Sequence, residues 1–460
     1  MSTPPRVLVI TPDRVGPAIA GPAIRALEIA RHLSAQQPCR LVSTHEDSQP
    51  ADLGVDHGVC DITALKQEVA AADVVIVQGA TLAMHPWIGE RDVVVIADMY
   101  DPLHLEVLET TAEEPVRLRQ AGLLATVHAL NCQLWRADLI LCASARQRDL
   151  WIGQLLSVGR ITPVLYDADP TLASLMRIVP FGLSDTPPGP ERAVRDVIPG
   201  IGRDDLVIVW GGGVYNWFDP LSLIEAVAEV RVDIPEVRLL FMGVGHPNPD
   251  VPAMSMVTRV RELSDERGLT GRHVMFNESW VPYSQRHAIL ADCDIGATTH
   301  FAHLETEFAY RTRVLDYLWA GLPVLATRGD VLAGLVGEEG LGRVVEPGDV
   351  AGIAAAIREL ADPAVRMAVR ERIAACAPAH TWSTVLAPLA EFTADPRRAA
   401  DAHDADYRRR LRLYTHAEGW LSPYRDLLRI RQHWRAGGPA ELVRGVRKRL
   451  RRIRREVTSR

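Results

Sequence analysis

The sequence lacks the long apolar runs and the paired cysteines that would place it in a membrane or an oxidising compartment. No run approaches the ~20 apolar residues that a membrane-spanning helix needs. The six cysteines are scattered without a Cys-x-x-Cys pair, which argues against a zinc site and a disulfide framework. Residues 1–10 lack the apolar core of a secretory signal and lead directly into a predicted strand. We therefore expect a cytoplasmic protein.

Positive charge is also scarce, except at the carboxyl end. The formal net charge of the chain is −7. Residues 441–460 contain nine Lys or Arg against Glu441 and Glu456, so this segment carries +7 and residues 1–440 carry −14. Because so acidic a body is a poor partner for a polyanion, we expect no binding of nucleic acid.

The pattern that is present is typical of a two-domain α/β protein. A chain of 460 residues exceeds one ordinary core and suits two domains of roughly 200 residues each. Two successive sets of short apolar runs, typical of buried parallel strands, are spaced by helix-like segments such as 23–33 and 118–135. The predicted strands are 6–10, 40–44, 74–78, 93–98 and 139–143, then 206–210, 238–243, 273–277, 294–298 and 323–327.

A Pro/Gly-rich stretch at 182–190 separates the two sets and marks a domain boundary. We predict two doubly wound, Rossmann-like domains at 1–185 and 186–400 that face a central cleft, followed by a helical extension at 401–460.

The stretch 294–327 contains the most informative chemistry. It reads in order as strand, acidic loop, two arginines, helix, glycine stop and strand, and its candidate ligand-binding residues are Glu305, Glu307, Arg311, Arg313 and Asp316. In a parallel sheet such a loop lies at the carboxyl end of a strand, where ligands bind. Carboxylates can hold sugar or ribose hydroxyls, and arginines can hold a diphosphate through paired donors. The stretch therefore predicts recognition of a nucleotide sugar.

This stretch resembles the nucleotide-sugar loop of the group 1 retaining glycosyltransferases (family 4), which have the two-domain GT-B fold. Residues 316–324, Asp-Tyr-Leu-Trp-Ala-Gly-Leu-Pro-Val, fit the second half of the family motif. The first glutamate is off register, because Glu307 precedes Asp316 by nine positions and Glu305 by eleven, where the family's spacing is eight. One or two residues are inserted, so either glutamate could fill the first role.

Three further segments resemble parts of the same family, and together the match spans residues 6–357. The segment 16–24, with Gly16 and Gly21, is similar to its amino-domain glycine loop, where backbone approaches the donor closely. The segment 178–182 is similar to its linker entry. The segment 209–215 is similar to the glycine turn that opens its carboxyl domain, and places Gly212 and Gly213 at the donor.

The chain departs from the family pattern at this second glycine turn. The family follows the turn with an arginine and a lysine that neutralise the leaving diphosphate, but residues 212–220 contain no basic side chain. Because the developing negative charge needs compensation, we predict that Arg311 and Arg313 supply it. The rigid His246-Pro-Asn-Pro loop is a further candidate for the donor pocket.

A second departure lies in the amino-terminal domain. Where the family places a histidine near the sugar, this chain has residues 97–105, which makes Asp98, Asp101 and His104 candidates for contacting the sugar or the acceptor hydroxyl. The alternative is that Asp98 or Asp101 caps the helix that follows. The Asp-x-Asp pairs at 167–169 and 404–406 are common by chance in so acidic a chain, and we expect neither a metal nor a cofactor.

The carboxyl tail predicts a basic amphipathic helix. Apolar side chains recur at alternating spacings of three and four, at Val443, Val446, Leu450, Ile453 and Val457, and Lys or Arg cover the other faces. Such a helix is typical of attachment to an anionic membrane surface, here the inner face of the cell membrane. The alternative is that the stripe docks on the protein's own acidic body.

The prediction is a retaining, metal-independent glycosyltransferase that moves a hexose-type sugar from a nucleotide-diphosphate donor to a saccharide or a lipid-linked acceptor in envelope or polysaccharide synthesis. Two alternatives stay open, a non-catalytic GT-B scaffold that binds a membrane partner and a sugar-nucleotide epimerase. The scaffold would hydrolyse no donor, and the epimerase would turn over the donor without an acceptor.

Overall fold

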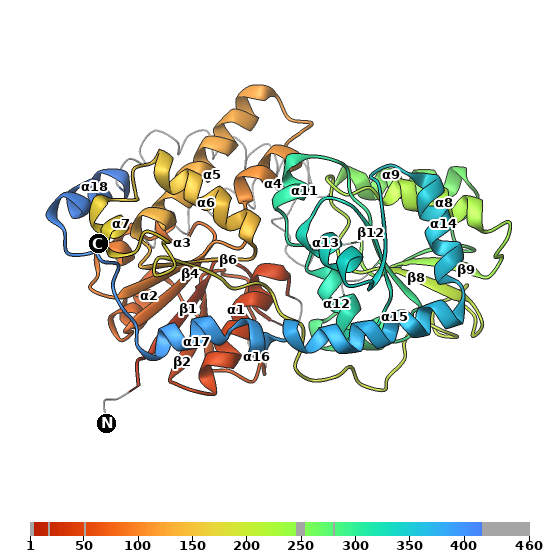
Figure 1. Cartoon of the computed structure of the whole chain (residues 1–460), viewed down its shortest axis with the longest axis horizontal. Coiled ribbons are helices and arrows are strands. Elements are labelled where there is room, and N and C mark those ends of the chain that lie inside the picture. Colours follow the sequence, from red (N-terminus) through yellow and green to blue (C-terminus); the bar gives the residue numbers. More distant parts are fainter. Residues whose placement is uncertain (1–3, 17–18, 50–51, 245–253, 279–280, 416–460) are drawn as a thin grey trace. The chain divides into compact units, whose positions relative to one another are not determined.

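The computed structural model of the chain describes residues 4–16, 19–49, 52–244, 254–278 and 281–415. The chain forms two compact units (Figure 1). The first unit contains residues 1–16, 20–180 and 386–460, and the second contains 17–19 and 181–385. Residues 386–400, which the predicted division placed in the second domain, lie in the first unit.

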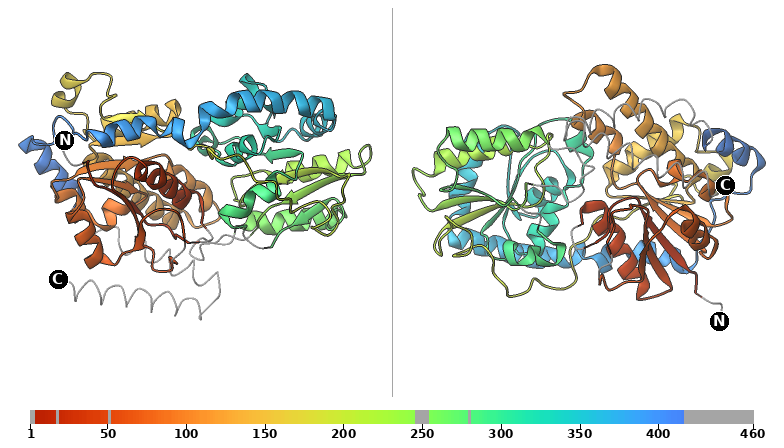
Figure 2. Two further views of the ribbon diagram at one scale, coloured as in Figure 1. Left: turned by 90° about the horizontal axis from the view of Figure 1, so that it is seen from below. Right: turned by 180° about the vertical axis from the view of Figure 1, so that it is seen from behind.

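The first unit contains a seven-stranded parallel sheet in the order β3-β2-β1-β4-β5-β6-β7. The strands are β1 (Val7–Thr11), β2 (Cys39–Ser43), β3 (His57–Val59), β4 (Val74–Gln78), β5 (Val94–Asp98), β6 (Leu139–Cys142) and β7 (Met176–Ile178). Every residue of β1, β4, β5 and β6 is buried, because helices cover both faces of the sheet (Figures 1 and 2). These continuous apolar runs are the ones that the sequence predicted.

The helices of the first unit are α1 (Gly21–Ser34), α2 (Ile62–Ala70), α3 (Thr81–Met84), α4 (Leu103–Thr110), α5 (Val116–Arg136), α6 (Ala145–Ser157), α7 (Pro163–Ala168), α17 (Ala387–Ala394) and α18 (Ala405–Thr415). A short 3-10 helix, η1 (Pro86–Glu90), follows α3. Helices α2, α5 and α6 share one hydrophobic cluster with the sheet, through Leu65, Leu134 and Trp151 among others. The predicted helices at 23–33 and 118–135 correspond to α1 and α5 and are confirmed.

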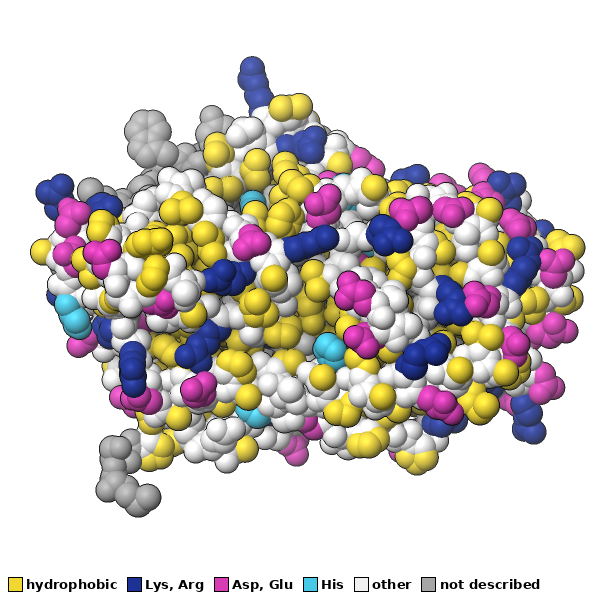
Figure 3. Space-filling view, viewed as in Figure 1, with side chains coloured by type: hydrophobic (Ala, Val, Ile, Leu, Met, Phe, Trp, Pro, Cys, Tyr) yellow, Lys and Arg dark blue, Asp and Glu magenta, His cyan; other side chains and the backbone are white. Residues whose placement is uncertain are grey.

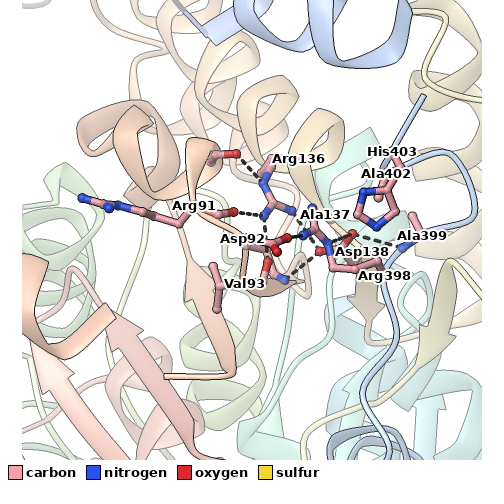
Figure 4. Close-up of polar contacts among 12 residues, drawn as sticks. Arg91, Asp92, Val93, Arg136, Ala137, Asp138, Arg398, Ala399, Ala402 and His403 are labelled. Atoms are coloured by element: carbon pink, nitrogen blue, oxygen red, sulfur yellow. Dashed lines mark hydrogen bonds and ion pairs between the residues drawn. The ribbon is translucent and has the colours of Figure 1, made fainter. Parts of the chain in front are cut away.

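Buried ion pairs join the carboxyl-terminal segment to the first unit. Arg398 donates to Asp138, whose other oxygen accepts from Arg136 at 2.9 Å (Figure 4). Asp401 pairs with Arg160 at 2.8 Å, and both side chains are fully buried. Because a buried charge needs its partner, these pairs explain why the segment after residue 386 packs with the first unit.

The second unit contains a six-stranded parallel sheet in the order β10-β9-β8-β11-β12-β13. The strands are β8 (Leu206–Trp210), β9 (Val237–Phe241), β10 (Val274–Phe276), β11 (Ile295–Thr298), β12 (Val324–Thr327) and β13 (Gly342–Val345). The order reverses between β8 and β11, as in other doubly wound sheets. Two doubly wound α/β domains, the predicted fold class, are therefore confirmed, while the predicted cleft between them stays a prediction.

The helices of the second unit include α8 (Pro220–Val230), α9 (Ser255–Glu266), α10 (Arg286–Leu290), α11 (Leu304–Phe308), α12 (Arg313–Trp319), α13 (Val331–Glu338), α14 (Val350–Leu360), α15 (Pro363–Cys376) and α16 (Trp382–Val385), with 3-10 helices η2 (Tyr283–Gln285) and η3 (Ala377–His380). The segment predicted as an acidic loop contains α11, which carries both glutamates. The predicted glycine stop is present, since Gly321 follows α12 with a left-handed φ of +69°.

None of the helices in the described ranges is both long and apolar enough to span a bilayer. On the face that Figure 3 shows, basic and acidic side chains are interspersed. The predicted basic helix at 441–460 lies outside the described residues.

Candidate functional site

The candidate donor site of the second unit lies where the carboxyl ends of three neighbouring strands meet. Strand β8 is followed by the glycine turn at 211–213, β11 by the segment from His300 to Arg313, and β12 by residues 328–330. Because β8, β11 and β12 are adjacent and parallel, their ends come together at one edge of the sheet. The predicted residues Gly212, Gly213, Glu305, Arg311 and Arg313 therefore gather around this edge.

Tyr317 of α12 fixes the glycine turn. Its hydroxyl donates to Ala297 O at 2.8 Å and accepts from Gly211 N at 2.7 Å. A Cβ at Gly296 would collide with the Tyr317 ring, and one at Gly211 would approach it to 3.0 Å. The two glycines are therefore needed to admit the ring, and Tyr317 is a site residue that sequence reasoning missed.

Arg313, at the start of α12, reaches back to the same turn. Its Nη2 donates to Gly213 O at 2.9 Å. The guanidinium lies over the rings of Phe218 and Trp210, at 4.3 Å and 4.7 Å from their centroids. Its Nη1 is buried and has no hydrogen-bond partner within the described residues. Burial lowers the pKa of Arg313 to about 10, so the side chain stays a cation at neutral pH.

The turn that lacks basic residues in its own sequence thus receives a cation from α12. Gly212 adopts a φ of +87°, a left-handed conformation that favours glycine. The aromatic residues after the turn, Phe218 above all, provide the faces on which the arginines rest. The sequence offered a weak signal for this packing, namely the aromatic residues that replace basic ones in 212–220.

Arg311 has a different environment from Arg313. Its Nη2 donates to Glu305 Oε2, and both side chains are almost fully buried. Glu307, the other candidate for the first glutamate of the motif, is exposed on the surface of α11. The structure therefore distinguishes the two glutamates, since Glu305 is the buried partner of Arg311 and Glu307 faces outward.

Two histidines and Asp330 complete this edge of the sheet. His303 caps α11, with Nδ1 accepting from Thr306 N at 3.2 Å and Nε2 positioned 3.1 Å from Trp217 O. His300 is fully buried with Nδ1 3.8 Å from Asp330 Oδ2, and burial lowers its pKa well below the ordinary value. Burial also raises the pKa of Asp330, while Arg311 acts in the opposite direction.

Asp316, the expected ribose ligand, lies on α12 beside α10. Its carboxylate pairs with Arg286 at 3.0 Å, and the Arg286 guanidinium lies 3.9 Å from the centroid of the Tyr283 ring. Burial raises the pKa of Asp316, and the positive charges of Arg286 and Arg313 oppose that shift. The other expected donor residue of this region, His246, lies outside the described residues.

In the first unit, Asp98 is committed to a buried ion pair. Both of its oxygens accept from Arg25, with the shortest distance 2.8 Å, and Gln78 Nε2 donates to Oδ2 at 2.9 Å. Arg25 also donates to the carbonyls of Val179 and Pro180. Asp98 is therefore the buried counterion of Arg25, while Asp101 and His104 stay predictions.

The alternative role for the two aspartates, capping the next helix, does not apply to Asp98, whose carboxylate is bound by Arg25 and Gln78. Helix α4 begins after Pro102 without a side-chain cap. His104 packs against Trp151 with ring centroids 5.6 Å apart, and burial lowers its pKa. Gly21 is the first residue of α1, where an added Cβ would meet open space, whereas a Cβ at Gly16 would contact Gln49.

The first of the two Asp-x-Asp segments, at 167–169, ends in a turn. Asp169 accepts hydrogen bonds from Thr171 N and Ser174 N, which is the turn expected there. No group of three His, Cys, Asp or Glu within the described ranges is arranged to hold a metal ion.

Residues 205–362 match the family model described as Glycosyl transferases group 1. No curated protein sequence matches the chain. Among solved structures, the chain is similar to Anabaena HepE in complex with UDP and glucose, at 15% identity and a TM-score of 0.59, over 85% of this chain and 100% of that one.

Two other solved structures are similar over most of their length. Sucrose-phosphate synthase from Thermosynechococcus elongatus has 16% identity and a TM-score of 0.56, over 84% of this chain and 98% of that one. WaaG, a glycosyltransferase involved in lipopolysaccharide biosynthesis, has 17% identity and a TM-score of 0.55, over 84% and 99%. At these identities the likeness concerns the fold, and it confirms the predicted GT-B architecture.

Proposed function

Residues 205–362 belong to the group 1 glycosyltransferases, and from that premise we propose that the protein is a retaining glycosyltransferase. It transfers a hexose-type sugar from a nucleotide-diphosphate donor to a saccharide or a lipid-linked acceptor, in envelope or polysaccharide synthesis. The donor binds at the edge of the second unit where β8, β11 and β12 end. Support for a UDP-sugar comes from HepE, whose structure contains UDP and glucose.

One observation carries the proposal, the cation placed at the glycine turn after β8. Arg313 contacts Gly213 O, although the turn itself contains no basic residue. When the bond between the sugar and the phosphate breaks, negative charge develops on the diphosphate, and a fixed guanidinium stabilises it. Because an arginine supplies this charge, the proposed reaction does not require a metal.

The other expected residues fit around this donor. A carboxylate of α11, from Glu305 or Glu307, contacts sugar hydroxyls, and Asp316 contacts the ribose. We further propose that Gly16, Gly21, Asp101 and His104 contact the sugar or the acceptor. The acceptor oxygen forms a bond to the sugar's anomeric carbon as the phosphate leaves from the same face, and the acceptor proton passes to a leaving phosphate oxygen.

The nucleotide site is tested by thermal unfolding with UDP, GDP, ADP and TDP, each at saturating concentration. A ligand at 100 times its Kd stabilises the folded state by about 2.7 kcal/mol, which raises the Tm by several degrees. We expect one nucleotide to do so. If none shifts the transition, the transferase proposal fails and the non-catalytic scaffold becomes the better explanation.

The tail at 441–460 is proposed to attach the enzyme to the inner face of the cell membrane. Its nine cations each add ~1 kcal/mol of attraction near an anionic surface. Deleting residues 436–460 is expected to abolish sedimentation with phosphatidylglycerol vesicles at low salt. Undiminished sedimentation of the truncated protein would contradict the membrane role.

A further inference from the structure

We propose that the two arginines expected to share the donor diphosphate have separate roles. Arg313 binds the diphosphate, whereas Arg311 is the internal counterion of Glu305 and makes no essential phosphate contact. The inference rests on the proposed function, because it assigns residues of the same nucleotide site. It departs from the sequence-based expectation, in which Arg311 and Arg313 both hold the phosphates.

The charge of Arg311 is already balanced within the protein. Glu305, which accepts from its Nη2, is only 2% exposed, and Arg311 itself is 7% exposed. The buried carboxylate of Asp330 exerts a further attraction on Arg311. Moving Arg311 towards a phosphate would leave Glu305 as an unpaired buried charge, which costs several kcal/mol. The resting pair is therefore more stable than an Arg311–phosphate contact.

The charge of Arg313 has no such partner in contact with it, although the carboxylate of Asp316, which pairs with Arg286, attracts it. Among the described residues, none with a carboxylate forms an ion pair with it, and its contacts are the neutral Gly213 carbonyl and two aromatic faces. The donors on its Nη1 lack an acceptor within the described part of the chain, as does the Nε of Arg311, so the two arginines differ in whether a carboxylate is their partner. A partly buried cation with unused donors is destabilised until an anion supplies both charge and acceptors.

Arg313 is also held in the orientation that the role requires. Tyr317 lies one helical turn after it, on the same face of α12. Because the Tyr317 hydroxyl is bound to Gly211 N and Ala297 O, the first turn of α12 stays beside the glycine turn. The guanidinium is thus preorganised beside the glycine turn, where the donor diphosphate is proposed to bind, and no large movement has to accompany binding.

The test compares removal of the arginine that has no carboxylate partner with removal of the buried ion pair. Arg313→Met removes the free cation, and the double variant Glu305→Gln/Arg311→Met removes the buried pair without leaving an unpaired carboxylate. Arg358→Met serves as the matched control, since Arg358 pairs with Glu229 and Asp233 on the surface of the same unit. Calorimetric titration uses UDP, GDP, ADP, TDP and inorganic pyrophosphate on the full chain, after circular dichroism has established that each variant is folded.

We expect Arg313→Met to weaken binding of the nucleotide diphosphate and of pyrophosphate at least tenfold. Because none of these ligands carries the donor sugar that Glu305 or Glu307 is proposed to contact, the double variant and Arg358→Met should stay within about threefold of the wild type. Wild-type affinity in Arg313→Met, or an equal loss in the folded double variant, would overturn the division of roles while leaving the nucleotide site intact. Arg313→Lys, which keeps the charge, provides a folded check if Arg313→Met aggregates, and we expect it to retain part of the affinity.

Failure of the proposed function gives a different result. If the wild-type protein binds neither a nucleotide diphosphate nor pyrophosphate, the donor site itself is absent and this inference falls with it. If the wild type binds the nucleotide but the double variant loses more affinity than Arg313→Met, the division of roles is wrong and the transferase proposal stands.

Discussion

The buried arginines of the two units differ in what surrounds them. In the first unit, Arg25, Arg136 and Arg160 each pair with a buried carboxylate and also donate to backbone carbonyls. In the second unit, Arg313 is held by one carbonyl and two aromatic faces, with no carboxylate partner among the described residues. A guanidinium paired with a buried carboxylate holds the fold together, and one without a carboxylate partner is available to a ligand.

Asp98 and Arg313 illustrate why burial alone does not identify a functional charge. Both lie at the carboxyl end of a parallel sheet, and both were candidates for a ligand-binding role. The Asp98 carboxylate accepts hydrogen bonds from Arg25 and Gln78, whereas the Nη1 of Arg313 has no acceptor among the described residues. Contact with an opposite charge therefore discriminates better than depth in the protein.

The strongest test of the comparison is to break the complete pair. Arg25→Met leaves Asp98 as a buried unpaired carboxylate and frees two backbone carbonyls, so we expect a loss of about 3–5 kcal/mol in the free energy of unfolding. Urea denaturation at pH 7 measures it. A loss below 1 kcal/mol would contradict the structural role of the pair.

A smaller loss is expected from Tyr317→Phe. The change leaves the buried Gly211 N–H and Ala297 C=O without the partner that Tyr317 provides, at a cost of about 1–3 kcal/mol. The measurement is denaturant unfolding, with Tyr166→Phe as control because Tyr166 is 53% exposed. Equal stability of the two variants would show that the hydroxyl does not fix the glycine turn.

The lowered pKa of His300 leads us to expect that the free energy of unfolding of the second unit depends on pH. Its folded-state pKa is well below the ordinary value because of burial, so the unfolded chain binds more protons below pH ~6.5. Stability is fully present above that pH and falls as the solution is acidified, by at most ~1.4 kcal/mol per pH unit from this residue. We expect His300→Gln to flatten the dependence between pH 6.5 and 5, whereas the exposed control His403→Gln should leave it unchanged. If the unfolding free energy of both variants depended on pH with the same slope, His300 would not be the cause of the acid destabilisation.

The smallest effect on stability is expected from Arg313→Met. No carboxylate loses its partner among the described residues, and only Gly213 O loses a donor, so unfolding free energy should change by less than about 1 kcal/mol. Measured beside Arg25→Met under the same conditions, this variant sharpens the comparison. A loss as large as that of Arg25→Met would make Arg313 a structural residue.

The sequence predicted the sheets well where strands are central and poorly where they are short and at an edge. Strands β4 and β8 have the predicted bounds because all of their residues are buried and all but Gln78 are apolar. The three-residue strands β3 and β7 were missed, as was the edge strand β13, since their residues are half-buried or exposed in most positions. So short a segment has no periodicity to detect.

The candidate site was predicted as a set of residues but not as a set of contacts. The approach of Arg313 to Gly213 joins positions that are 100 residues apart, which one sequence does not reveal. The split of the acidic segment into α11 and α12 was also missed, because α11 has only five residues and begins at a histidine cap. The pairing of Glu305 with Arg311 follows from that split, and with it the difference between the two arginines.

The return of residues 386–411 to the first unit has a consequence for synthesis on the ribosome. Residues 181–385 form most of the second unit as one continuous stretch, whereas the first unit is completed by residues near the carboxyl end. Until Asp401 emerges, Arg160 has no carboxylate within the described residues to neutralise it. Because domains fold as they are synthesised, we expect the second unit to finish folding while the first still waits for its last charge partner. Chains released early would therefore expose an incomplete first unit beside a finished second one.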